Sequence, residues 1–459
     1  MEVKGTYGGG GFLIHDGFSG REPAFEEAVA AGLDFVAVDA GSTDCGPRHL
    51  GTEEGLIPED ALKLQLSYLL SLTIPRGIPL LIGSANVAGT RGGLLRFSRA
   101  LAEVAQAAGH HFRAAFIDSE LDKTYLRRKL SDGKIRPLHP MGQLTNGDID
   151  RAEHVVAMMG TEPYVHALQG GATVIIGGRT SDPALFAAVP IWKGVPLAIA
   201  WHMAKVIDHG QTILELEPGH AHFEPGAPSW VIGVAAMDHF RVEASNMRGR
   251  CSAVRTAHTT LYENRSPTSF YEPPGNIDIS QCRYEQVDPQ TVRVVGSQLI
   301  PLEYTLKLEG AERIGFRAIT MCGFRAPDLV ANIDSRLDRL KRQVEAKAAL
   351  QGIGAEAFRI LFHVYGKDGV MGAWEPNKDF LPQEIFVLAE CVADTQEMAS
   401  HVGVILETAL HILGGANFGG SFPYGAQVFE GGPVCKFTVW HLLEPGDAME
   451  CCRIDFVDY

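Results

Sequence analysis

The sequence predicts an α/β protein with two domains. The first is a parallel sheet with helices on both faces, Rossmann-like in layout, and the second is an α+β domain of ferredoxin-like layout. Over the first 245 residues short apolar runs alternate with helix-forming segments, as in a parallel sheet that is buried on both faces. Many of the 51 glycines directly follow apolar runs, which indicates tight strand-to-helix turns. Because 459 residues are too many for one ordinary core, we expect domains at 1–245 and 246–459.

Six short apolar runs are the predicted strands of the first domain. They are GFLIHDG (11–17), DFVAVD (34–39), PLLIGS (79–84), FRAAFID (112–118), HVVAMMG (154–160) and TVIIGG (173–178). Helix-forming segments separate them, and the clearest is PEDALKLQLSYLLSLT (58–73), which has proline in its first turn and apolar residues three and four apart. These runs predict the parallel sheet and the helices that cover it.

The second domain changes character, because the regular alternation of strand and helix stops past about residue 245. The segment 280–300 predicts two antiparallel strands around Asp288-Pro289. Further strands are predicted at 313–323, 358–366, 384–394 and 432–444, with amphipathic helices at 328–348 and 395–415. This order of strand, helix, strand, strand, helix, strand fits a ferredoxin-like sandwich. We expect a structural, dimerising or lid role for it.

Composition and charge exclude several classes of protein. The net charge of −15 argues against nucleic-acid binding, which needs a basic surface. No apolar run reaches membrane-spanning length and the N-terminus lacks a secretory pattern, so we expect a cytoplasmic protein with no membrane contact. The eight cysteines are scattered without a CxxC motif, which predicts reduced thiols rather than a zinc site.

Polar residues follow most of the predicted strands at their carboxyl ends, where open parallel sheets bind their ligands. We therefore predict that these residues bind a small anionic substrate. They are Asp16, Ser19, Arg21, Ser42, Gly83, Ser84, Asn86, Asp118, Gly178, Arg179, Thr180 and Ser181. Among them, the backbone amides of Gly83 and Ser84 are expected to bind the anion together with Arg179.

The stretch VIIGGRTSDPALFAA (174–188) is the most informative one. Its double glycine and Arg179 lie between a strand and a helix that begins near Pro183, so Arg179 and free backbone amides would hold a carboxylate or phosphate. The alternative is that Ser181 or Asp182 only caps the helix. Capping accounts for Asp182 but leaves Arg179 and the glycines unexplained.

Four residues are predicted to move protons, namely Asp39, Asp44, Asp182 and His202. Asp39 and Asp44 could instead hold a divalent cation, or form a turn that caps their own loop. The loop DAGSTDCGP is similar to the phosphate loop of actin-like ATPases, but its continuation does not fit one. The chain has no GxGxxG dinucleotide fingerprint and no GxSxG nucleophile elbow. We therefore expect no cofactor, although a divalent metal remains an option.

Several of these segments resemble the AtuA-like family, which is named for a protein of acyclic terpene utilisation. The resemblance runs from GFSGREPAFEEAVAAGLDFVAVD through GSANVAG to EPYVHALQGGATVIIGGRTSDPALFA. The family's block ALxxGADIVITGRxxDxAL reads ALQGGATVIIGGRTSDPAL here. Two family segments differ, Gly-Asp-Asp after the fourth strand and Gly-His-x-x-Glu-Cys, of which only His202 is kept. The resemblance implies a catabolic enzyme that acts on an organic acid or its CoA thioester.

Together these observations predict a cofactor-independent lyase or hydratase that uses acid–base chemistry on a carboxylate. One alternative is a metal-dependent hydrolase whose metal is held by Asp39, Asp44 and a histidine. The other is a non-catalytic subunit of a two-component enzyme. We further expect a homo-oligomer, with a small partner subunit as an option.

Overall fold

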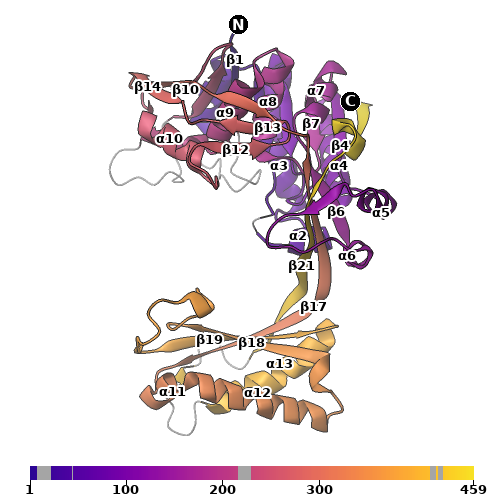
Figure 1. Cartoon of the computed structure of the whole chain (residues 1–459), viewed down its shortest axis with the longest axis vertical. Helices are drawn as coiled ribbons and strands as arrows, with labels where there is room; N and C mark the ends of the chain where they lie inside the picture. Colours follow the sequence, from indigo (N-terminus) through magenta and orange to yellow (C-terminus); the bar gives the residue numbers. More distant parts are fainter. Residues whose placement is uncertain (8–21, 44, 216–228, 414–419, 422–426) are drawn as a thin grey trace. The chain divides into compact units, whose positions relative to one another are not determined.

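The computed structural model describes residues 1–7, 22–43, 45–215, 229–413, 420–421 and 427–459. The chain forms two compact units, Met1–Glu312 with Phe437–Tyr459, and Arg313–Lys436 (Figure 1). The predicted boundary at residue 245 falls inside the first unit, because strands on both sides of it belong to one sheet. No helix among the described residues is both long and apolar enough to cross a membrane.

A ten-stranded sheet forms the centre of the first unit. Its middle is parallel, in the order β1 (Val3–Tyr7), β2 (Phe35–Asp39), β3 (Leu80–Gly83), β7 (Val174–Gly177) and β4 (Arg113–Asp118). Antiparallel strands extend it on both sides: β9 (Val231–Ala235), β10 (Phe240–Ala244), β15 (Thr291–Val295) and β14 (Arg283–Asp288) beyond β1, and β22 (Arg453–Asp458) beyond β4. The α/β class and the large sheet with a parallel centre are confirmed, while the finer Rossmann-like and ferredoxin-like layouts stay predictions.

Both faces of this sheet are buried because alternate residues of each strand enter different cores. In β2, Phe35 and Ala37 pack with helices on one face, whereas Val36 and Val38 pack with helices on the other. The first face is covered by α7 (Glu162–Gln169), α8 (Asp182–Trp192) and α9 (Leu197–Asp208), and the second by α1 (Glu22–Ala30), α3 (Glu59–Thr73) and α4 (Arg91–Ala108). The continuous apolar runs of the sequence follow from this double burial.

The predicted fifth strand of the parallel sheet is β6 (His154–Met158), and its expected position is wrong. It pairs antiparallel with the first part of β17 (Leu306–Phe324) and is not a member of the ten-stranded sheet. The amide of Ala157 donates to Ser119 O at 2.9 Å, just beyond the end of β4. The pair β6–β17 therefore lies at the carboxyl edge of the sheet, and it brings residues near 309 to that edge. The predicted strand 11–17 lies outside the described residues.

Smaller elements complete the first unit. They are α2 (Arg48–Thr52), α5 (Lys123–Ser131), β5 (Ile135–Pro137), α6 (Asn146–Arg151), β8 (Leu214–Glu215), β11 (Arg250–Cys251), α10 (Ala253–Leu261), β12 (Ser269–Glu272), β13 (Gly275–Asp278) and β16 (Gln298–Pro301). The strands β12, β13 and β16 form a separate antiparallel sheet, which places Glu272 near the start of α8. The hairpin predicted around Asp288-Pro289 is confirmed as β14–β15.

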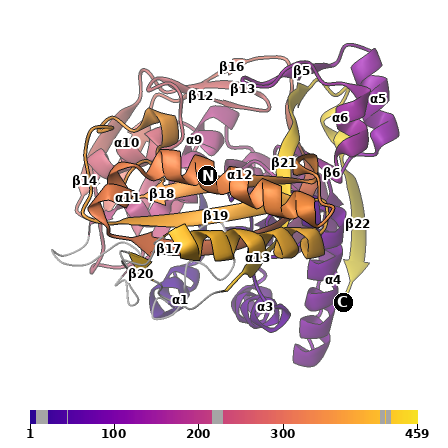
Figure 2. The same ribbon diagram turned by 90° about the horizontal axis from the view of Figure 1, so that it is seen from below.

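The second unit is built from the end of β17, α11 (Pro327–Ala331), α12 (Ile333–Leu350), β18 (Phe358–Tyr365), β19 (Ile385–Ala393), α13 (Gln396–Leu413), β20 (Gly420–Ser421) and the start of β21 (Phe429–Leu443). Its strands lie in the order β18, β19, β17, β21. The helices α12 and α13 lie side by side against these strands (Figure 2) and share one apolar core with them. The order of its elements is the one predicted from the sequence.

Glycines let the loops at the carboxyl edge of the large sheet approach one another closely. A Cβ atom on Gly89 would lie 2.1 Å from the backbone nitrogen of Arg179, and one on Gly41 would lie 2.0 Å from Val87 O. A Cβ on Gly178 would lie 2.7 Å from Ser119 Oγ. A Cβ on Gly177 would lie 1.9 Å from Tyr164 Oη, so the double glycine before Arg179 makes room for the side chains of Tyr164 and Ser119.

We predict that Gly89→Ala destabilises the protein much more than Gly109→Ala. Both glycines have left-handed φ angles, +66° and +65°, so both substitutions carry the same conformational cost of about 1 kcal/mol. Only at Gly89 does the added methyl group meet backbone atoms, whereas at Gly109 no atom lies within 4 Å. Thermal melting should show a shift of a few degrees for Gly109→Ala and a several-fold larger one for Gly89→Ala. Equal shifts would contradict the close packing of these loops.

Candidate functional site

Four predicted residues lie next to one another at the carboxyl edge of the large sheet. The strand order β2, β3, β7, β4 and its register place Asp39, Ser84, Arg179 and Asp118 along this edge in that order. This arrangement is the one expected from a parallel sheet, whose strand ends meet at one side. Residues that are far apart in the sequence are thereby brought together.

Arg179 is the centre of this group and is 4% exposed. Its Nε donates to Glu309 Oε2 at 3.0 Å, and its Nη1 donates to Ser84 Oγ at 3.1 Å and to Asp182 Oδ1 at 3.4 Å. Its Nη2 has a longer contact, 3.5 Å, with Thr43 Oγ1. The Nε and Nη1 groups thus donate to protein acceptors at 3.0–3.4 Å, whereas among the described residues Nη2 makes only the longer contact with Thr43.

Glu309 and Lys307 reach this edge from β17, and no sequence motif predicted either of them. Lys307 Nζ lies 2.8 Å from Glu309 Oε1 and 3.5 Å from the centre of the Trp440 ring. Burial alone would raise the pKa of Glu309, but Arg179 and Lys307 hold that pKa below its usual value. Glu309 is therefore a fully buried anion between two cations.

Asp39 and Asp182 both interact with Arg179, and both hold protons more strongly than usual. Burial, with Asp182 and Asp208 nearby, raises the pKa of Asp39 well above its usual value. Burial also raises the pKa of Asp182 to about 6, against the opposing effect of Arg179. Raised carboxyl pKa values in a group of charged side chains are typical of residues that exchange protons with a substrate.

A second half of the site comes from α9 and β12. Ser181 Oγ donates to Glu272 Oε2 at 2.7 Å, and burial raises the pKa of Glu272 to about 7. Lys205 is 8% exposed, and its closest anionic partner in the described chain is Glu263 Oε2 at 3.7 Å, which is longer than a hydrogen bond. Lys205 influences the pKa of both Asp182 and Glu272, so it is a cation held among carboxyl groups.

At the start of α8 no side-chain capping hydrogen bond from Ser181 is found, in contrast to the alternative considered from the sequence. Ser181 occupies the cap position without a side-chain bond to the helix, because its hydroxyl donates to Glu272 instead. Asp182 is the first residue of the helix, and its carboxylate contacts Arg179. Thr180 is fully buried and its hydroxyl donates to Gly178 O at 2.9 Å while bonding Tyr164.

Other predicted residues have local roles or lie elsewhere. The amide of Ser84 donates to Gly178 O at 2.9 Å, so it is not free to bind an anion as predicted. Gly83 makes room for Leu185, whose Cδ1 would lie 2.7 Å from an added Cβ. Ser42 lies half-buried in the loop after β2. The predicted residues outside the described parts of the chain are Asp16, Ser19, Arg21 and Asp44.

In the described part of the chain no hydrogen bond joins His202 to Arg179, and the His202 ring lies elsewhere in the first unit. Its ring bonds Ser297 Oγ at 2.7 Å, Thr260 Oγ1 at 3.3 Å and Tyr284 Oη at 3.2 Å, inside the core of the first unit. Burial lowers its pKa to about 3, so it is a neutral imidazole at ordinary pH. Its predicted role in proton transfer stays a prediction.

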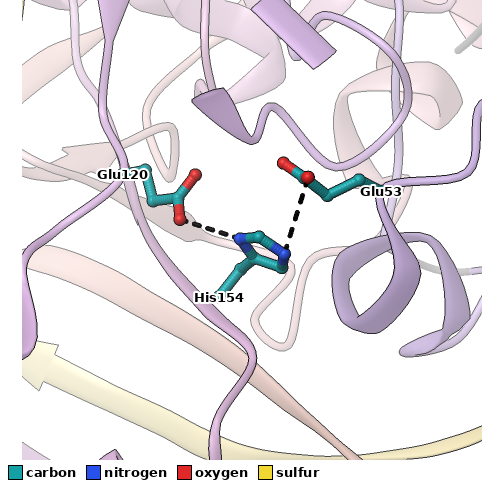
Figure 3. Close-up of side chains that lie close together, drawn as sticks. All are labelled: Glu53, Glu120 and His154. Atoms are coloured by element: carbon teal, nitrogen blue, oxygen red, sulfur yellow. Dashed lines mark hydrogen bonds and ion pairs between the residues drawn. The ribbon is translucent and has the colours of Figure 1, made fainter. Parts of the chain in front are cut away.

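Asp118 and Asn86 belong to a second polar group at the same edge. Asp118 Oδ2 accepts from Arg91 Nε at 2.6 Å, and Asn86 Nδ2 donates to Glu53 O at 3.0 Å. Next to them the His154 ring lies between two carboxylates, with Nδ1 2.8 Å from Glu120 Oε1 and Nε2 3.8 Å from Glu53 Oε2 (Figure 3). Within the described chain, Glu53, Glu120 and His154 form a group whose side-chain ligand atoms are close enough together to hold a metal ion.

Comparison with known proteins supplies the family. The model of the acyclic terpene utilisation family protein AtuA matches residues 63–203 and 230–435, which is most of the chain. The chain belongs to the AtuA family. No curated protein and no solved structure gives a significant match.

The AtuA match includes Ser84, Arg179, Asp182, Glu272 and Glu309. It also includes Asp118, Glu120, His154, His202 and Lys307. Asp39, Glu53 and Lys205 lie outside the matched ranges. The family resemblance noted in the sequence is thereby confirmed.

We predict that Glu272→Gln stabilises the folded protein at alkaline but not at acidic pH. The folded-state pKa of about 7 exceeds the usual 4.5, so ionising Glu272 opposes folding as the pH rises between these values. Glutamine removes this cost and can still accept from Ser181. At about pH 8 the gain should be on the order of 1–2 kcal/mol, after discounting for solvent screening. Thermal melting as a function of pH measures it, with the exposed Glu303→Gln as control. A gain that is the same at about pH 4 and pH 8 would show that ionisation of Glu272 is not its cause.

Proposed function

We propose that this AtuA-family chain is a catabolic enzyme that adds water to, or eliminates water from, an organic acid or its CoA thioester. The observation that supports it most directly is a group of carboxyls with raised pKa, namely the buried Asp39 and the half-buried Asp182 and Glu272, beside the nearly buried cations Arg179 and Lys205. Hydration of a double bond that is conjugated to a carbonyl requires a base, an acid and a group that stabilises negative charge.

The different pKa values of Asp182 and Glu272 suit them to different roles, one as base and one as acid. Asp182, with a pKa of about 6, is mostly ionised at neutral pH and can accept a proton from water. Glu272, with a pKa of about 7, is substantially protonated there and can donate one. In the addition direction Asp182 would take the proton of water, the hydroxyl would bond to the β-carbon, and Glu272 would protonate the α-carbon. Elimination is the reverse.

Lys205 is the group best suited to hold the substrate's carboxylate or thioester oxygen. Its ammonium is nearly buried, and among the described residues its closest anion, Glu263, is beyond hydrogen-bond distance. A cation in a low-dielectric site stabilises an enolate-like charge much more than it would in water. Arg179 mainly positions Asp182 and Ser84, and only its Nη2 would reach a ligand.

The family assignment indicates the substrate class. Because the family is described by acyclic terpene utilisation, branched unsaturated acids and their CoA thioesters are the compounds to try first.

The experiment is an assay of the purified protein on 2-enoyl-CoA thioesters with straight and methyl-branched chains. Loss of the conjugated-thioester absorbance reports hydration. We expect Asp182→Asn to lower kcat by about 10²–10⁴-fold, as for loss of a general base. Lys205→Met should lower kcat/KM through both constants, because it removes a substrate contact and the stabilisation of the enolate-like charge, and the exposed Glu303→Gln should leave both constants unchanged.

The pH profile provides an independent readout. If ionised Asp182 is the base, kcat/KM should fall as the pH drops below about 6, and this limb should disappear in Asp182→Asn. Hydration that persists at full rate in Asp182→Asn and Glu272→Gln would rule out the assigned roles. Absence of activity on every thioester and free acid in the set would rule out the reaction itself.

A further inference from the structure

The carboxylates of Glu53 and Glu120 converge on His154 from separate parts of the chain. Glu53 directly follows α2, Glu120 follows β4, and His154 begins β6. One ligand atom from each of the three side chains lies within 4.8 Å of the other two. All three residues are half-buried, with side-chain exposures of 34%, 15% and 23%. We propose that Glu53, Glu120 and His154 bind one divalent first-row transition metal ion, of the Mn²⁺, Fe²⁺ or Zn²⁺ class.

The first turn of α4 orients both carboxylates toward the histidine. The amide of Arg91 donates to Glu120 Oε2 at 2.7 Å, and the adjacent amide of Gly92 donates to Glu53 Oε1 at 3.0 Å. The other oxygen of each carboxylate is the one that faces the His154 ring. Each carboxylate is thus held by one oxygen and offers the second, which is how supporting hydrogen bonds commonly fix metal ligands.

The spacing needs little adjustment to hold an ion. Metal bonds of about 2.1 Å at tetrahedral angles put ligand atoms about 3 to 3.5 Å apart. One ion would bind a single nitrogen of the His154 ring, and the three candidate ligand atoms already lie within 4.8 Å of one another. A metal would replace the hydrogen bond between His154 and Glu120, and small side-chain rotations would complete the set.

The nature of the ligands selects the metal. One imidazole with two carboxylates suits Mn²⁺, Fe²⁺ and Zn²⁺, whereas Mg²⁺ and Ca²⁺ prefer oxygen ligands alone. Asp118 adds negative charge nearby, and it also neutralises Arg91 through the 2.6 Å contact of its Oδ2 with Nε. Three protein ligands leave coordination positions for water or a ligand.

This proposal is independent of the acid–base reaction, because none of its three ligands belongs to the Asp182 and Glu272 group. Its effect would be to tie three segments together at the sheet edge. Binding to the folded state alone then raises the melting temperature with metal concentration.

The test is titration of chelator-stripped full-length protein with Mn²⁺, followed by the electron paramagnetic resonance signal of the free ion. Manganese is chosen because thiols such as the exposed Cys45 compete poorly for it. We expect about one equivalent to bind, with a rise in melting temperature, and at least about tenfold weaker binding in His154→Gln and Glu120→Gln. The control is His363→Gln, whose ring contacts a single carboxylate, Glu390, at 3.3 Å.

Three results would overturn the proposal. One is wild-type protein that binds neither Mn²⁺ nor Zn²⁺ and melts unchanged in their presence, which would make His154 only an ion-pair partner of two carboxylates. Another is binding that Glu53→Gln, Glu120→Gln and His154→Gln all retain. The third is Mg²⁺ binding as tightly as Mn²⁺, which would contradict the imidazole ligand. None of these results bears on hydration activity.

Discussion

The buried contact between Arg179 and Glu309 is the interaction on which the carboxyl edge of the sheet depends. A charged pair this deep must recover the loss of its hydration through short contacts and further hydrogen bonds. Ser84, Thr43 and Lys307 supply them. Because Arg179 follows β7 and Glu309 is in β17, the pair joins the parallel sheet to a strand that arrives 130 residues later.

Protonation at this edge follows from an excess of carboxyl groups over cations. Asp39, Asp182, Asp208, Glu272 and Glu309 share the region with Arg179, Lys205 and Lys307, as their mutual effects on pKa show. Glu309 takes the strongest cationic contacts and stays ionised. The remaining carboxyls have less compensation, so burial raises the pKa of Asp39, Asp182 and Glu272. Because Glu309 takes the strongest contacts with the cations, the neighbouring carboxyls Asp39, Asp182 and Glu272 keep raised pKa values.

The sequence predicted the sheet edge well, because parallel strands always bring their ends to one side. Asp39, Ser84, Arg179 and Asp182 were found from that rule and from the residues after each apolar run. Glu309 could not be found in this way. In β17 the side chains of Leu306 and Leu308 point into another core. Glu309 occupies the opposite position in this two-residue alternation, which in most strands faces solvent.

The placement of Lys205 and the pairing of β6 also could not be predicted from local sequence patterns. Lys205 lies on a helix that is buried on every side, where periodicity cannot show which face meets a site. The strand β6 has the apolar run of a buried parallel strand, but it pairs with residues of β17 that lie about 150 positions further along the chain. Local patterns determine the elements, whereas these long-range pairings determine which charged groups meet.

The loop after β3 connects the two polar groups and must be held rigidly. Ser84, Asn86 and Val87 have φ angles of +50°, +59° and +77°, a region that costs non-glycine residues energy, most of all a β-branched one. Ser84 bonds Arg179, while Asn86 bonds the backbone of Glu53 and accepts from Arg96 at 2.6 Å. An ion held by Glu53, Glu120 and His154 would strengthen one anchor of this loop. The same short backbone segment therefore brings Ser84 to Arg179 and Asn86 to Glu53.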